Sequence, residues 1–200
     1  HKGVSQQKIN TGGVMNAQWQ MWQRGVSPDT CDKIIQECEK LQPMQGEIGG
    51  VGPGGALVSD VRRSQVRWAG HIKWIHDLVW SYASHANRQA FGFDLSLLED
   101  IQYTEYDGSQ QGYYNWHEDT FWGGPTCFDR KLSVVIQLSN PEEYEGGKFL
   151  LENIENPAED ELKQRGSVLV FPSPLRHMVE PVTKGHRKSL VAWVEGPKFR

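Results

Sequence analysis

The chain has 200 residues, a formal net charge of −4 and 38% hydrophobic residues. This length suits one domain that can bury a real core, so we expect residues 1–200 to form a single domain. The slightly acidic balance gives no electrostatic footprint for nucleic acid or anionic lipid and disfavours both as partners. No apolar run approaches the roughly 18 residues that a spanning helix needs, and we expect no membrane association.

Two helices are predicted in the first half of the chain. Ser27 suits an N-cap and is followed by Pro28 at the first helical position, after which apolar residues recur at helical spacing as far as Leu41. A second helix is predicted at about 71–87, with an apolar stripe along one side. Between them, the Gly- and Pro-rich segment 46–55 predicts a mobile loop.

From about residue 98 the apolar residues follow a period of two, which is typical of strands. Turn signals such as Asp107-Gly108 and Lys184-Gly185 separate the segments. The predicted strands are 101–106, 131–139, 148–151, 167–171, 177–182 and 187–194. Helices followed by many short antiparallel strands indicate a mainly β fold with supporting helices. We expect a double-sheet jelly roll at about 98–195, supported by helices at about 26–90.

Three cysteines bear on the cellular compartment. Cys31 and Cys38 fall two turns apart on one predicted helix, a separation of about 10 Å that is beyond disulfide reach. Together with Cys127 they cannot all pair, and their spacing does not suggest a zinc site. Free thiols in a reducing cytosol are the simplest interpretation, so we expect a cytoplasmic protein.

A candidate metal site lies in Trp116-His117-Glu118-Asp119. On an extended chain, residues i and i+2 project to the same side, so His117 and Asp119 can bind one ion. A second histidine, His177, begins another predicted strand. Two imidazoles and one carboxylate form the facial triad of non-haem iron(II) oxygenases, which leaves open positions for a co-substrate and oxygen. An HxD pair alone often occurs by chance, so the pattern needs a third element.

Arg187 supplies that third element. It shares one face of its predicted strand with Ser189, Val191 and Trp193, and both faces are largely apolar, so we expect the strand to be buried on both sides. An inward guanidinium needs an anion to offset its desolvation. A dicarboxylate whose other end chelates the metal would supply one. An arginine that reaches solvent at a strand end is the alternative, which the HxD pair and the second histidine disfavour.

The order of these motifs resembles the prolyl 4-hydroxylase superfamily of 2-oxoglutarate-dependent oxygenases, over roughly residues 102–193. The matched residues are Tyr106, Gly108, Tyr114, His117, Asp119, Gly146-Gly147, Gly166-Ser167, Phe171-Pro172, His177, Pro181-Val182, Gly185, Arg187 and Trp193. The resemblance implies a double-stranded β-helix with Fe(II) bound by His117, Asp119 and His177. It also implies 2-oxoglutarate and O2 as co-substrates, with ascorbate as an optional addition. Arg187, where the collagen-modifying branch has Lys, is similar to the oxygen-sensing, bacterial and phage-like branches.

The resemblance further implies roles around the co-substrate. Arg187 would bind the distal carboxylate of 2-oxoglutarate, and Tyr106 matches a tyrosine that contacts the co-substrate. Gln137 lies where related enzymes carry a Tyr or Thr that supports the same carboxylate. Gln can donate a hydrogen bond there, so we count it among the co-substrate residues.

On the substrate side, Tyr114 and Trp193 match positions that line the peptide site. Arg130 falls near a substrate-contacting arginine, although its strand parity is opposite to that of Gln137. The basic segment 62–68 looks like the one that precedes the support helix in bacterial and phage hydroxylases. It is equally well explained as solvated charge.

Together these patterns predict a peptidyl hydroxylase that acts on proline in a peptide or protein. The same chemistry on lysine, a free amino acid, another small molecule or a nucleic-acid base stays open, and the acidic balance disfavours the last. From other classes, a non-catalytic jelly-roll binding module and a cupin-like zinc protein are alternatives. The intact ligand set and Arg187 weigh against a silent module. We also expect segments 47–56 and 120–125 to act as lids over substrate.

Overall fold

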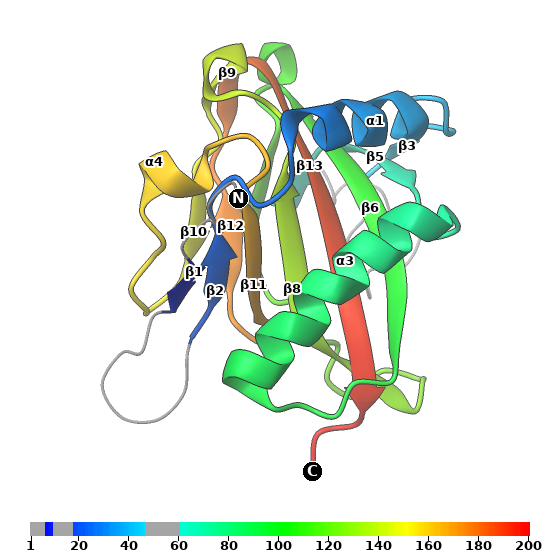
Figure 1. The fold of residues 1–200 in the computed structure, drawn as a ribbon. Coiled ribbons are helices and arrows are strands. Elements are labelled where there is room, and N and C mark those ends of the chain that lie inside the picture. Colours follow the sequence, from blue (N-terminus) through cyan, green and yellow to red (C-terminus); the bar gives the residue numbers. More distant parts are fainter. Residues whose placement is uncertain (1–6, 10–17, 47–60) are drawn as a thin grey trace.

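The computed structural model describes residues 7–9, 18–46 and 61–200, and these form two antiparallel sheets with helices on the outside (Figure 1). The larger sheet contains, in spatial order, β1 (Gln7–Ile9), β2 (Gln20–Trp22), β11 (Val168–Pro172), β8 (Phe128–Gln137), β13 (Val182–Pro197), β6 (Leu97–Asp107), β5 (Gln65–Trp68) and β3 (Met44–Gln45), with β9 (Tyr144–Gly146) paired to β13. The smaller sheet contains β10 (Phe149–Leu151), β12 (His177–Val179), β7 (Tyr113–His117) and β4 (Arg62–Arg63). This is a double-stranded β-helix, and the predicted jelly roll is confirmed.

The helices cover the outer face of the larger sheet (Figure 1). They are α1 (Pro28–Cys38) and α3 (Lys73–Ala86), which continues into a π-helical turn (Asn87–Phe91). The short α4 (Glu159–Leu162) lies apart from them, and its Leu162 packs on the apolar cluster that contains Phe149 and Phe171. Short 3-10 turns lie at Gly108–Gln110 and Pro141–Glu143. The side chain of Ser27 accepts a hydrogen bond from the Thr30 amide, so the predicted N-cap is confirmed. The apolar stripes of both long helices pack on the sheet, as predicted.

Strand β13 is buried on both faces. Its residues Leu190, Ala192 and Val194 belong to the core beneath the helices. The alternate residues line a cavity between the two sheets, namely Arg187, Ser189, Val191 and Trp193. Alternate side chains of β13 therefore point to opposite faces, one toward the core beneath the helices and one into the cavity, where chemistry can take place.

The predicted turn at Lys184-Gly185 is wrong, because β13 runs without interruption from Val182 to Pro197. Gly185 has a φ of +67°, and a Cβ at this position would collide with the carbonyl oxygen of Glu143. Glycine is needed here because β13 passes close to the chain that enters β9, rather than because the chain reverses. The sequence pattern also missed β7, whose residues Tyr113–His117 do not alternate between apolar and polar.

The cysteines of the structure are all free, with Cys31 and Cys38 buried and Cys127 exposed. Within the described ranges, no helix is both long and apolar enough to cross a membrane.

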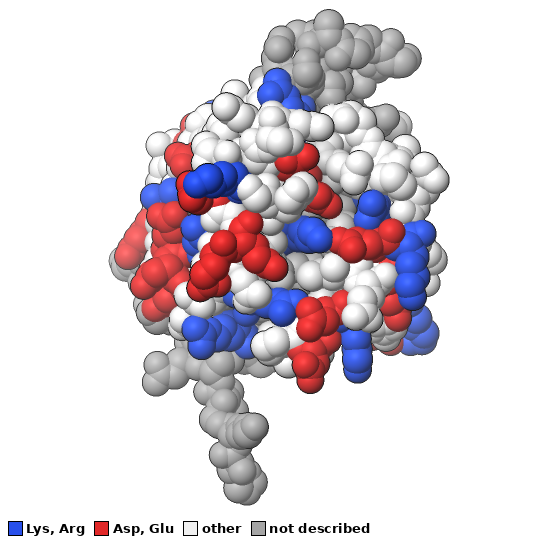
Figure 2. Space-filling model, turned by 90° about the horizontal axis from the view of Figure 1, so that it is seen from above, with Lys and Arg blue, Asp and Glu red and all other residues white. Residues whose placement is uncertain are grey.

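Charges of both signs are interspersed on the face shown in Figure 2. The predicted loop at 46–55, beyond Gly46, and the predicted lid at 47–56 lie outside the described residues.

Candidate metal centre and adjoining cavities

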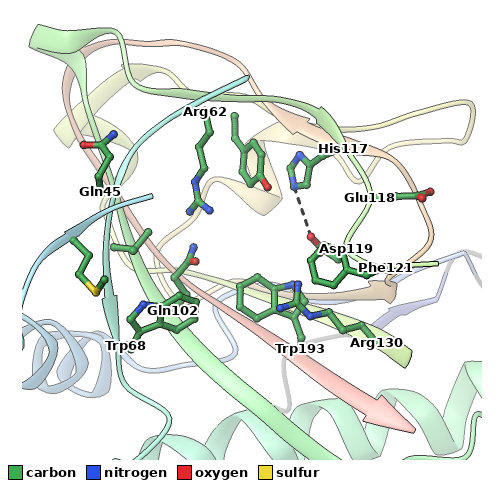
Figure 3. Close-up of a pocket in the computed structure, with 13 residues that line it drawn as sticks. Gln45, Arg62, Trp68, Gln102, His117, Glu118, Asp119, Phe121, Arg130 and Trp193 are labelled. Atoms are coloured by element: carbon green, nitrogen blue, oxygen red, sulfur yellow. Dashed lines mark ion pairs between the residues drawn. The ribbon is translucent and has the colours of Figure 1, made fainter. Parts of the chain in front are cut away.

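Three side chains meet between the sheets as a candidate metal centre. His117 ends β7 and His177 begins β12, and the two residues are direct partners in the smaller sheet. Nε2 of His117 lies 3.6 Å from Oδ1 of Asp119, and Nε2 of His177 lies 3.4 Å from Oδ2 (Figure 3 shows the first pair). The three ligand atoms lie within 4.8 Å of one another, so one ion can contact all of them. The predicted set of ligands is confirmed.

Hydrogen bonds hold each ligand in the orientation that a metal needs. Nδ1 of His117 lies 2.7 Å from the carbonyl oxygen of Asn115, and Nδ1 of His177 lies 2.8 Å from that of Leu175. A carbonyl can only accept, so both Nδ1 atoms carry hydrogen and both Nε2 atoms present a lone pair. The Ser133 hydroxyl donates to Oδ2 of Asp119 over 2.7 Å.

The electrostatics also fit a divalent metal. Burial, together with the neighbouring His177, lowers the pKa of His117 to about 3, so its imidazole is neutral at physiological pH. Burial alone would raise the pKa of Asp119, but the two imidazoles and the Ser133 hydroxyl outweigh it and lower this pKa. Two imidazoles and one carboxylate suit iron(II) and leave further coordination positions open.

Arg187, which is only 4% exposed, lines the cavity beside the ligands. Its Cζ lies 5.6 Å from the ring centroid of Tyr106, which lines the same cavity. Both residues therefore line the same cavity as the metal ligands, and their roles toward the co-substrate stay a prediction. Gln137 does not line this cavity; it borders a smaller one and donates to the hydroxyl of Tyr144 over 3.0 Å.

A larger cavity of about 230 Å³ adjoins the first one and shares its walls at His117 and Asp119 (Figure 3). The predicted substrate residues Tyr114, Trp193 and Arg130 all line it. The ring of Tyr114 stacks on His117 with centroids 3.4 Å apart, so this wall reaches the metal centre directly. We call this cavity the substrate groove.

Arg130 reaches the groove because of a β-bulge. In the β8–β13 pairing, Leu132 lies opposite Val194 and Arg130 lies opposite Glu195, so Lys131 is the extra residue. One extra residue reverses the side to which the following side chains point. The parity argument against Arg130 assumed a regular strand and is wrong for that reason.

Arg130 is held rigidly at the groove. Its Nε and Nη2 donate to the two carboxylate oxygens of Glu99 over 2.5 and 3.0 Å. Its Cζ lies 4.1 Å from the ring centroid of Trp193 and 4.6 Å from that of Phe121. Such a paired and stacked guanidinium keeps one orientation.

Sequence reasoning left Arg62 undecided between a solvated and a substrate-facing role. The structure buries it to 3% exposure, and it lines both the groove and the cavity beside the ligands. Its Cζ lies 4.5 Å from the ring centroid of Tyr114, and its Nε donates to Ser64 over 2.7 Å. In the sequence, the signal that could have revealed this position is Ser64, which lies two residues after Arg62 and therefore on the same side of an extended chain. Trp68, the last residue of the segment 62–68, also lines the groove. So does Gln102, which no sequence motif had singled out for the site.

The predicted lid 120–125 lies beside the groove. Phe121 lines the groove, and Trp122 is 58% exposed. The side chain of Glu118, which lies between two ligands in sequence, points away from the metal centre (Figure 3).

Comparison with known proteins finds relatives for part of the chain. The family model described as the 2OG-Fe(II) oxygenase superfamily matches residues 101–195. A PKHD-type hydroxylase from Crocosphaera subtropica is 33% identical over 98 residues, which is 48% of this chain and 43% of that protein. The chain thus spans less than half the length of that relative.

Solved structures share the fold. The viral collagen prolyl hydroxylase of Paramecium Bursaria Chlorella virus-1, in its 2OG complex, superposes with a TM-score of 0.67 at 17% identity and covers 90% of this chain and 96% of that one. A prolyl hydroxylase from Trichoplax adhaerens, in complex with a hypoxia inducible factor peptide fragment, gives 0.65 at 19% identity and covers 88% and 83%. The shared fold, the matched segment and the three ligands agree with one another. Residues 101–195 match the 2OG-Fe(II) oxygenase superfamily, whose name gives Fe(II) and 2-oxoglutarate, and His117, Asp119 and His177 within this segment can hold the iron.

Proposed function

We propose that this chain is a hydroxylase that acts on a peptidyl substrate, with proline as the residue that is modified. The observation that carries the proposal is the substrate groove, which leads from the surface to the metal centre between aromatic walls. Trp68 and Trp193 lie side by side there, with ring centroids 6.3 Å apart. Flat aromatic faces suit a compact apolar ring such as that of proline. Two neighbours in fold are described as prolyl hydroxylases, one of them bound to a peptide.

Iron and 2-oxoglutarate, when bound, would supply the oxidising chemistry together with O2, in which one oxygen atom of O2 enters a substrate C–H bond and the other enters the succinate that forms with carbon dioxide. The protein's part is to bind, orient and exclude water. Arg187 would anchor the distal carboxylate of the co-substrate, and Tyr106 would pack beside it. Tyr114 and Trp193 would hold the substrate over the metal and keep bulk water away.

The two arginines of the groove give it a positive lining beside the aromatic walls. Arg130 is paired with Glu99 and so keeps a fixed direction. Arg62 is stacked on Tyr114, next to a metal ligand. In this position each guanidinium could donate to backbone carbonyls of an extended peptide, a role that a free amino acid would not need.

The test is turnover with a defined panel. The protein is purified without oxygen, loaded with Fe(II) and given 2-oxoglutarate with proline-containing peptides, each matched by a peptide in which alanine replaces proline. Mass spectrometry should find the mass of one added oxygen on proline, together with stoichiometric succinate. Oxygen on lysine or on a free amino acid would refute the peptidyl-proline proposal while keeping the chemistry. Retained zinc with no succinate would favour a cupin-like zinc protein or a silent binding module.

The stretch 120–125 offers a second test, of the proposed lid. Phe121 lines the groove and packs on Arg130, so a bound peptide would contact it. Protease cleavage within this stretch should become slower when iron, co-substrate and peptide are all present. Unchanged cleavage would exclude closure over the substrate.

A further inference from the structure

Tyr144 lies beside Arg187 in a small cavity that adjoins the one beside the metal ligands. It begins β9, lies opposite Gly185 of β13 and is 5% exposed. Gly147, with a φ of +68°, makes this approach possible, because a Cβ there would lie 3.0 Å from Cδ of Arg187 and 3.3 Å from Cε2 of Tyr144. The paired glycines after Tyr144 thus allow its ring and the guanidinium to pack closely together.

The Tyr144 hydroxyl accepts two hydrogen bonds. One comes from Nε2 of Gln137 over 3.0 Å, and the other joins it to the guanidinium of Arg187, which can only donate. The Gln137 amide is oriented independently, since its Nε2 also faces the carbonyl oxygen of Ser139 at 3.5 Å. Both lone pairs of the phenol oxygen are therefore used, and its own proton remains available to donate.

A small cavity of about 20 Å³ is lined by Tyr144, Gln137 and Arg187. Arg187 and Phe149 line this cavity and also the one beside the metal ligands, so the guanidinium lies where the two meet. The space has room for about one water-sized group, such as a carboxylate oxygen. Burial raises the pKa of Tyr144, which keeps the phenol protonated at physiological pH.

We propose that the Tyr144 hydroxyl donates a hydrogen bond to the distal carboxylate of 2-oxoglutarate alongside Arg187, and that Gln137 is a positioning residue that acts through Tyr144. The inference rests on the proposed binding of the co-substrate's tail at Arg187. It changes the role of Gln137, which sequence reasoning placed in direct contact with the co-substrate. Tyr144, which would supply the hydroxyl beside Arg187, lies in β9, and Gln137 of β8 fixes the direction of that hydroxyl.

The test measures binding rather than turnover. Protein loaded with Mn(II), which accepts the same type of ligands, is titrated by calorimetry with 2-oxoglutarate and with 2-oxopentanoate, which lacks the second carboxylate. Tyr144→Phe should weaken binding of 2-oxoglutarate about tenfold and leave 2-oxopentanoate unchanged. Tyr103→Phe is the matched control, since it removes a buried tyrosine hydroxyl that donates to Glu39 outside the cavity. This control should leave both affinities unchanged.

A double-mutant cycle tests the positioning role. Gln137→Ala should weaken 2-oxoglutarate binding in the wild-type background and add no loss to Tyr144→Phe, because the two side chains act as one unit. An additive loss would show a direct contact of Gln137 and would overturn that part of the proposal. Should Tyr144→Phe fail to fold, as judged by its thermal unfolding, Gln137→Ala alone still has to show the selective loss for the dicarboxylate.

The possible failures are distinguishable. Wild-type protein that binds both ligands equally would refute the proposed binding of the distal carboxylate at Arg187 itself. Wild-type protein that prefers 2-oxoglutarate, with a Tyr144→Phe variant that prefers it to the same extent, would refute only the role of Tyr144. Equal weakening of both ligands by Tyr144→Phe would also refute it, since that result indicates a distorted cavity.

Discussion

The metal centre and the substrate groove adjoin one another but are built in different ways. The metal centre takes its two histidines from directly paired positions of two short strands, and backbone carbonyls fix both rings. The groove takes Arg62 from β4, Trp68 from β5 and Phe121 from the stretch after the ligands. A metal accepts few ligand types at fixed spacing, whereas a groove can be walled by many different side chains. We therefore expect substitutions in the two regions to differ in the size and kind of their effects.

The largest effect should come from a metal ligand. Asp119→Ala removes the one carboxylate of the triad, and we expect the affinity for Fe(II) to fall by more than about 100-fold and succinate formation to stop. Metal binding is measured by titration under anaerobic conditions. The adjacent Glu118→Ala is the matched control, since its carboxylate points away from the metal centre (Figure 3). Equal metal affinities in the two variants would refute the triad.

Removal of Arg187 should leave the metal site intact. Because the guanidinium is buried in the cavity beside the metal ligands and is not itself a ligand, Arg187→Ala should raise the KM for 2-oxoglutarate about 100-fold, a change of about 2.7 kcal/mol, with Fe(II) affinity unchanged. Arg187→Lys keeps the charge and should recover part of the loss. A parallel fall in metal affinity would show that Arg187 and the metal ligands do not act independently.

A smaller effect is expected at the side chain that supports the carboxylate ligand. Ser133→Ala removes the donor to Oδ2 of Asp119, and residues that orient a ligand in this way typically change metal affinity by about tenfold. Ser81→Ala is the control, since its hydroxyl bonds only to the Leu78 carbonyl on the exposed side of α3. No difference between the two variants would show that the Asp119 carboxylate is held by other contacts.

The contrast between the two regions also explains how far the sequence could be interpreted. The helices, most core strands and the three ligands follow from local periodicity and from residue types that chemistry restricts. The position of Arg130 depends on the extra residue Lys131 in β8. The alternation of apolar and polar residues does not reveal such a bulge, so the sequence could not predict the side to which Arg130 points. The turn expected at Gly185 failed because glycine serves a close approach there, and the two uses of glycine look alike in sequence. Arg62 stayed undecided between a solvated and a substrate-facing role because only the folded sheets bury it.

The smallest effect should come from the groove itself. Arg130→Gln removes a charge that packs on Trp193, and we expect the KM for a peptide substrate to rise about fivefold to tenfold while the KM for 2-oxoglutarate stays unchanged. Glu99→Gln separates two explanations, because it keeps the guanidinium but weakens the pair that orients it. If orientation matters, both variants should raise the KM for peptide. If only charge matters, Glu99→Gln should lower it, since the guanidinium would then be less neutralised.

The same pair of variants has a consequence for stability that does not involve substrate. Burial and the neighbouring Glu99 raise the pKa of Glu195, so these two carboxylates lie close enough to repel each other, and Arg130 offsets that repulsion. Arg130→Gln should therefore lower the thermal unfolding temperature, and Glu99→Gln should restore it in the double variant. If Arg130→Gln raised the KM for peptide without lowering the unfolding temperature, its contribution would be to binding alone. A drop in unfolding temperature that the double variant did not reverse would place the loss in the stacking on Trp193 and Phe121 instead.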